Sequence, residues 1–138
     1  MKRVLLIPFL FAFYIGIAQN TNPASIIGNP IKIGNLLVAK NDFPKEMGSY
    51  EADKICKKLG NGWRLPSIDE LKLIYKLAQK NNAGNFSMNR YYWSGTIYDG
   101  KIPPPYISLD FSTGEEDWSD VYDPDNFPKT RAVKSISK

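Results

Sequence analysis

The segment from Trp63 to Glu70 constrains the fold of this 138-residue chain more than any other feature. Ser67 and Glu70 have the Ser-x-x-Glu spacing of a capping box, in which each side chain accepts a hydrogen bond from the other residue's backbone N–H at the start of a helix. Apolar residues then recur at the spacing of one helix face, at Leu71, Ile74, Tyr75 and Ala78. The sequence therefore predicts a helix that begins near Ile68 and buries this stripe.

A further helix is expected before this one, and strands on both sides of the pair. The apolar residues of this earlier helix are Ala52, Ile55, Cys56 and Leu59. Ser49 is its expected N-cap, and Gly60 stands at the left-handed position after its C-terminus. The alternating segment 31–43 predicts a strand or a tight strand pair. Shorter strands are expected at 91–95, at 106–111, around Trp118 and at 130–136. This order predicts an α+β fold rather than repeating βαβ units.

The N-terminus has the pattern of a secretory signal peptide. Lys2 and Arg3 precede an apolar run, and Gly16 and Ala18 put small residues at the cleavage positions. The run, residues 4–18, is shorter than the ~20 residues that span a bilayer. We expect residues 1–18 to be removed, and the alternative is an uncleaved membrane anchor. The mature protein is then expected to be extracytoplasmic, periplasmic or secreted, without membrane attachment.

The remaining residues are interpreted as one domain. Residues 19–30 are rich in Asn, Pro and small side chains and are interpreted as a linker, which leaves 31–138 as the domain. Loss of Lys2 and Arg3 lowers the formal net charge from +4 to +2, so nucleic acid is not an expected partner. The single cysteine, Cys56, cannot form an internal disulfide, and stability must come from the core.

Residues across this domain resemble the Lcl C-terminal family. Gly62-Trp63-Arg64-Leu65-Pro66-Ser67 followed by Glu70-Leu71 is similar to its GWRLPT-x-x-EL signature. Ala52 and Cys56 match its preceding helix, and the later matches are Tyr92-Trp93-Ser94 for its YWSS strand, Phe111 and Gly114 for its F-x-x-G turn, and Arg131-Ala132-Val133 for its closing strand. The matches span most of residues 36–136. The resemblance implies a C-type-lectin-like fold, two N-terminal helices packed on a small, irregular antiparallel sheet, and a role in adhesion or surface display.

The chain departs from related patterns at three places. Tyr106 follows Pro103-Pro104-Pro105 where the Lcl family commonly has Trp, so this loop is expected to be reshaped. One cysteine excludes the two-cysteine copper chemistry of formylglycine-generating enzymes. Trp118-Ser119-Asp120 matches the Trp-Asn-Asp motif of calcium-dependent animal lectins only in part. We therefore predict no metal site and no cofactor, and calcium binding by the acidic stretch at 115–125 stays open as an alternative.

Two groups of residues are singled out by these patterns. The signature residues are expected to hold the fold, with Trp63 and Leu65 buried and Arg64 paired: Trp63, Arg64, Leu65, Pro66, Ser67, Glu70 and Arg131. The second group is aromatic. Three consecutive aromatics cannot all face one side of a strand. Some of them are candidates for stacking on a ligand, with core packing as the alternative: Tyr91, Tyr92 and Trp93, and with them Trp118.

Lysines recur on one side of each predicted helix. They are Lys72, Lys76 and Lys80 on the later helix and Lys54, Lys57 and Lys58 on the earlier one. If the two helices pack side by side, these lysines form one basic face for a sulfated glycan, an anionic polysaccharide or lipopolysaccharide. The alternative is an ordinary solvated helix surface.

The composition restricts catalysis. The chain has no histidine, which excludes Ser-His-Asp and Cys-His catalysis and the ordinary histidine zinc site. Carboxylates that would suit a glycoside hydrolase, or form a solvated acidic loop, are Glu115, Glu116, Asp117, Asp120, Asp123 and Asp125. We predict a non-catalytic module that binds a polysaccharide or a cell-surface protein. The alternatives are a structural subunit of a surface assembly and a glycan-acting enzyme that uses residues 115–125.

Overall fold

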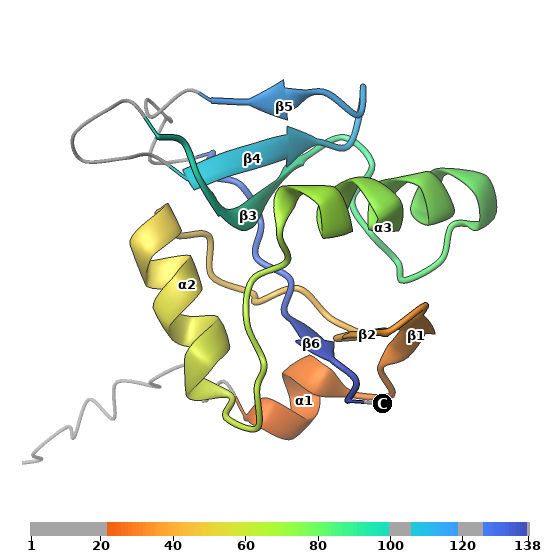
Figure 1. Ribbon diagram of the computed structural model, residues 1–138, viewed down its shortest axis with the longest axis vertical. Helices are drawn as coiled ribbons and strands as arrows, with labels where there is room; N and C mark the ends of the chain where they lie inside the picture. Colours follow the sequence, from red (N-terminus) through yellow and green to blue (C-terminus); the bar gives the residue numbers. More distant parts are fainter. Residues whose placement is uncertain (1–21, 100–105, 119–125, 138) are drawn as a thin grey trace, which may run out of the picture.

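The computed structural model describes residues 22–99, 106–118 and 126–137. Within these ranges the chain forms three helices and two three-stranded antiparallel sheets (Figure 1). The helices are α1 (Pro23–Ile27), α2 (Ser49–Lys58) and α3 (Ile68–Asn81). One sheet has the order β1 (Ile31–Ile33), β2 (Leu36–Val38), β6 (Val133–Ser135), and the other has the order β3 (Tyr91–Ile97), β4 (Tyr106–Asp110), β5 (Glu116–Asp117). The predicted α+β class is confirmed.

The sheet architecture differs from the predicted single sheet. The segment 31–43 folds as the tight pair β1 and β2, joined through Gly34 and Asn35, with Ile33 opposite Leu36. The C-terminal strand β6 pairs with β2 and not with β4, so it closes a separate sheet. Strand β3 extends two residues beyond the predicted range, whereas β6 covers only the middle of 130–136. The sequence pattern contains no signal for which strands become neighbours.

The predicted linker is also wrong where it is described, because residues 23–27 form α1. Asn22 caps this helix by accepting a hydrogen bond from the Ala24 backbone N–H at 3.1 Å, and Pro23 occupies the first turn. Ile26 is buried in the core at 3% exposure. The folded domain therefore begins before Ile31. A helix of five residues is too short to show helical periodicity in the sequence.

The two longer helices begin and end at residues with clear local signals. Ser67 and Glu70 form the predicted capping box at the start of α3. In α2 the N-cap is Gly48 rather than the predicted Ser49, which is the first helical residue, and no side chain caps this end. Gly60 has a φ of +73°, as expected for a left-handed residue after a helix. None of the helices in the described ranges is long and apolar enough to cross a membrane.

Helices α2 and α3 cover opposite faces of the β3–β4–β5 sheet, because each packs its apolar side into a different core. Tyr92 and Trp93 are consecutive in β3, so their side chains point to opposite faces. Tyr92 lies in the α3-side core with Leu71, Ile74 and Leu109, among others. Trp93 lies in the α2-side core, whose members include Ala52, Cys56, Trp63 and Leu65. The sheet is thus buried on both faces, and each helix presents its outer side to solvent.

Candidate binding site

The Trp63–Glu70 signature is a structural element. Trp63 and Leu65 are buried at 6% and 3% exposure, which confirms the prediction, and Pro66 is fully buried. Arg64 makes two parallel hydrogen bonds to Glu70, from Nη1 to Oε1 at 2.7 Å and from Nη2 to Oε2 at 3.0 Å. Burial by itself would raise the pKa of Glu70, but hydrogen bonds from Arg64 and Ser67 outweigh it, so this pKa lies below its usual value. The signature locks α3 to the chain that leads into it.

Arg131 is the centre of a buried polar network that joins three distant segments. Its Nε donates to Asp42 Oδ1 at 2.6 Å, and its Nη1 donates to the carbonyl oxygens of Ala39, Lys40 and Gly84. The guanidinium carbon lies 4.0 Å from the centre of the Phe86 ring. At 2% exposure Arg131 is not accessible to a ligand. Arg131 therefore lies within the folded core and contacts the segments around Asp42 and Gly84.

Tyr92 and Trp93 are not available for ligand stacking, at 0% and 3% exposure. Tyr92 donates its hydroxyl to Asp42 Oδ2, and Trp93 donates Nε1 to the Met47 carbonyl oxygen at 2.8 Å. Both faces of β3 are covered by helices, so these two residues pack in the core and do not stack on a ligand. Tyr91 is partly exposed at the start of the strand, and burial together with Asp110 raises its pKa.

The predicted joint lysine face does not exist. Helices α2 and α3 bury their apolar sides in two different cores on opposite faces of the sheet, so their solvent-facing sides do not form one surface. On α3, Lys72 forms an ion pair with Glu116, while Lys76 and Lys80 are exposed farther along the helix. The prediction fails because helical periodicity gives the solvent side of each helix but not the position of one helix relative to the other.

The acidic stretch is described only in part. Glu116 accepts hydrogen bonds from Lys72 and from Trp118 Nε1, and these two bonds lower the pKa of Glu116. Glu115 is exposed. Asp120, Asp123 and Asp125, with Ser119 and the Pro103-Pro104-Pro105 run, lie outside the described residues. Within the described ranges, no three Cys, Asp or Glu side chains gather in a way that could hold a metal ion.

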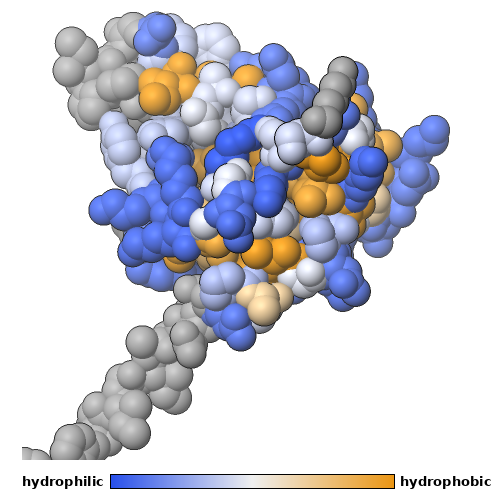
Figure 2. Space-filling view, turned by 60° about the horizontal axis from the view of Figure 1, so that its bottom comes forward, coloured by the Kyte–Doolittle hydropathy of each residue, from blue (hydrophilic) through white to orange (hydrophobic). Residues whose placement is uncertain are grey.

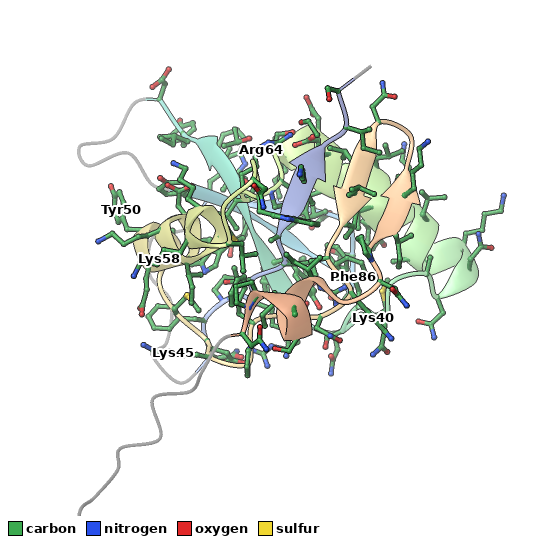
Figure 3. The ribbon with its side chains drawn as sticks, turned by 90° about the horizontal axis from the view of Figure 1, so that it is seen from below. Lys40, Lys45, Tyr50, Lys58, Arg64 and Phe86 are labelled. Carbon is green, nitrogen blue, oxygen red and sulfur yellow. The ribbon has the colours of Figure 1, made fainter. Side chains whose placement is uncertain are left out.

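The solvent side of α2 carries a shallow depression of about 640 Å³ lined by Tyr50, Asp53, Lys54, Lys57 and Lys58. We call these five residues the α2 surface. They lie at positions i, i+3, i+4, i+7 and i+8, which puts them on one side of the helix. Figure 3 shows Tyr50 and Lys58 on α2, away from Phe86 and Lys40 on the other side of the molecule.

Contacts within the α2 surface fix its shape and leave it positively charged. Tyr50 is 58% exposed and contacts the buried Tyr106 edge to face, with ring centres 5.4 Å apart. Lys57 donates to Asp53 at 2.9 Å, and this hydrogen bond raises the pKa of Lys57. Neither Lys54 nor Lys58 forms an ion pair with another described residue. Three lysines therefore face one aspartate.

A second exposed group lies on the α3 side of the β3–β4–β5 sheet. Trp118 is 47% exposed, and its ring lies against Tyr98 with centres 4.8 Å apart and an angle of 35° between the planes. Of the four aromatics considered as ligand-stacking candidates, Trp118 is therefore the one with a largely open ring. Sequence reasoning missed Tyr50 and Tyr98. For Tyr50 a signal was present, because it stands four residues before Lys54 on the predicted helix.

The described residues on the face of α1 and the small sheet are of mixed character. Seen from the side of α1 and the small sheet, hydrophilic residues surround separate apolar patches (Figure 2). A smaller depression of about 200 Å³ is lined by Asn29, Ile31, Lys40, Asn41, Gly84 and Asn85. It lies beside the backbone carbonyls that bind Arg131, which ties these residues to the structural network.

Comparison with known proteins shows the fold. The chain is similar to the crystal structure of botrocetin, a C-type-lectin-like protein, with a TM-score of 0.53 and 14% sequence identity over 80% of this chain and 98% of botrocetin. No protein-family model matches the sequence, and no curated protein does. The resemblance to the Lcl C-terminal family therefore stays a prediction, and the likeness to botrocetin assigns a C-type-lectin-like fold to this chain.

Proposed function

We propose that this protein is an exported, non-catalytic binding module that holds an anionic surface polysaccharide on the α2 surface. The observation that carries the proposal is the combination of three lysines, an exposed tyrosine and a depression on one side of one helix. The module is proposed to belong with the Lcl C-terminal family and to act outside the cytoplasm. The C-type-lectin-like fold is compatible with a binding role, since such roles reside in surface features carried by a rigid scaffold.

The charge distribution supports an anionic partner. Lys54 and Lys58 form no ion pair with another described residue, whereas Lys57 is paired with Asp53. Like charges this close on one helix repel each other by a few tenths of a kcal/mol per pair, and an anionic ligand removes this cost. Sulfate, phosphate or carboxylate groups along a polymer would reach several lysines at once, which raises the overall affinity through multivalency.

Tyr50 and the depression support a polysaccharide as the carrier of these charges. A tyrosine offers a rigid, amphipathic surface at low entropic cost, suited to the C–H face of a sugar ring. The shallow depression extends along the helix and is open, as a chain that continues past the site requires. The mature net charge of +2 expected from the sequence is too small for tight nucleic-acid binding.

The experiment is a binding titration of the full-length protein with heparin, alginate and uncharged dextran at two salt concentrations. We expect binding to heparin or alginate and none to dextran at the α2 surface. Affinity should fall steeply between about 0.05 M and 0.5 M salt, because exposed charges are screened within about 10 Å at 0.1 M. Heparin and alginate binding that the variant Lys54→Gln, Lys57→Gln, Lys58→Gln retains in full, or heparin binding that salt does not weaken, contradicts the proposal.

A further inference from the structure

The pair formed by Tyr98 and Trp118 lies on the α3 side of the β3–β4–β5 sheet, apart from the α2 surface. Tyr98 packs against the α3-side core. Glu116, two residues before Trp118 in β5, pairs with Lys72 of α3. Trp118 directly follows β5, and its side chain lies beside that of Glu116, because the two are joined by a hydrogen bond. These four residues, Lys72, Tyr98, Glu116 and Trp118, form what we call the aromatic platform.

The platform is held in place before any ligand arrives. Trp118 Nε1 donates to Glu116 Oε2 at 2.7 Å, while Lys72 donates to the other oxygen of the same carboxylate. The indole ring is thus fixed at its N–H edge by a carboxylate that is itself anchored to α3. The contact with Tyr98 supports the ring from a second direction. A ligand that covers this ring loses little free energy to ordering the protein.

The electrostatics of the platform differ from those of the α2 surface. The charges of Lys72 and Glu116 cancel. Asp99, the residue after Tyr98, is exposed and adds a negative charge. The described residues of the platform therefore carry no net positive charge that would favour an anionic ligand. Each carboxylate oxygen has two acceptor positions, and one on each is taken by Lys72 or Trp118. The platform therefore offers an apolar ring next to unused hydrogen-bond acceptors.

We propose that the aromatic platform binds one ring of an uncharged sugar polymer. A pyranose presents a C–H face to an aromatic ring and hydroxyl donors at its edge, which matches Trp118 and Glu116. A proline-rich peptide fits less well, because proline has no N–H and offers only carbonyl acceptors. The Trp118 N–H that would serve such an acceptor is already bound to Glu116. This second site does not depend on the function proposed for the α2 surface.

The test is a calorimetric titration of the full-length protein with uncharged hexasaccharides from cellulose, chitin, mannan and starch. We expect at least one of them to bind, with an affinity that stays the same between about 0.1 M and 1 M salt, where the screening length falls from about 10 Å to about 3 Å. Trp118→Ala should lower that affinity about tenfold or more, as expected for an aromatic at the centre of a contact. The inference is overturned if no hexasaccharide binds, or if Trp118→Ala binds like the wild type.

Two controls separate the platform from other surfaces. Leu73→Ala removes an apolar side chain that is 46% exposed on the same helix as Lys72, and it should leave sugar binding unchanged. The triple variant Lys54→Gln, Lys57→Gln, Lys58→Gln should also leave it unchanged, which distinguishes this site from the α2 surface. A proline-rich peptide that displaces the sugar and binds more tightly would count against the assigned ligand class.

A measurement on the wild type covers the case in which Trp118→Ala does not fold. Trp63 and Trp93 are 6% and 3% exposed, so N-bromosuccinimide should oxidise Trp118 first. The bound hexasaccharide should slow this first oxidation step, detected by mass spectrometry of the tryptic peptide that contains Trp118. An oxidation rate that the sugar does not change contradicts the inference.

Discussion

Gly114 lies against the ring of Tyr75: a Cβ atom at position 114 would come within 2.5 Å of Tyr75 Cε1. Gly114 also has a φ of +79°, in the left-handed region that favours glycine. This contact brings the β4–β5 turn close to α3 and explains why the turn has glycine at position 114. We expect Gly114→Ala to lower the free energy of unfolding by about 2–4 kcal/mol, from backbone strain and overpacking together. Urea denaturation measures this.

Gly34→Ala is the matched control for that substitution. Gly34 also has a positive φ, +56°, but a Cβ there would meet no atom within 4 Å. The loss at Gly34 should therefore be only about 1–2 kcal/mol, the backbone component alone. Equal losses of unfolding free energy in Gly114→Ala and Gly34→Ala would show that crowding against Tyr75 does not add to the cost at position 114.

Asp42→Asn tests the buried network around Arg131. The side chain of Arg131 is 2% exposed, and Asp42 is the carboxylate bound to it at 2.6 Å. Removing that charge leaves a buried guanidinium without a counter-charge, so we expect a loss of about 3–5 kcal/mol. Glu51→Gln is the control, because the Lys45–Glu51 pair is more than half exposed and its loss should cost less than about 1 kcal/mol. Thermal and urea unfolding of both variants give the comparison.

Glu70→Gln tests the linkage between the Arg64 pair and acid stability. The folded-state pKa of Glu70 lies below its ordinary value of 4.5, so the carboxylate stabilises the fold above that pH. This contribution is lost as the pH falls through the folded-state pKa. Between about pH 5 and pH 3 the wild type should therefore lose more stability than Glu70→Gln does.

Export predicts a processed N-terminus. If residues 1–18 act as a signal peptide, protein recovered from its native host should begin at Gln19, intact or cyclised. Mass spectrometry of the isolated protein decides this. Intact Met1 in a membrane fraction would instead favour the uncleaved anchor.

Local signals explain what could be predicted from the sequence. The capping box fixes the start of α3, because Ser67 and Glu70 bond to each other's backbone within one turn. The burial of Trp63 and Leu65 follows from their position between a glycine turn and that helix. Each of these features depends on residues close together in the chain, where spacing alone determines the geometry.

Features that depend on distant segments could not be predicted in the same way. Alternation along β3 puts Tyr92 and Trp93 on opposite faces, but it does not reveal that α2 and α3 cover both. The prediction of a joint lysine face was wrong for the same reason, because the position of α2 relative to α3 could not be predicted. The burial of Ile26 was not predicted, because α1 is too short to show periodicity. The core partners of Ile26, Ala39 and Phe43, also lie more than ten residues away in the chain.

The most direct test of the α2 surface compares two charge-matched variants in heparin binding. The first is Lys54→Gln, Lys57→Gln, Lys58→Gln. The second is Lys32→Gln, Lys76→Gln, Lys80→Gln, which removes three exposed lysines from β1 and α3. Both lose the same net charge, so a general electrostatic attraction would weaken equally in the two. We expect the first variant to lose about tenfold or more in affinity and the second to stay within about twofold of the wild type. Equal losses, or a larger loss in the second variant, would contradict it.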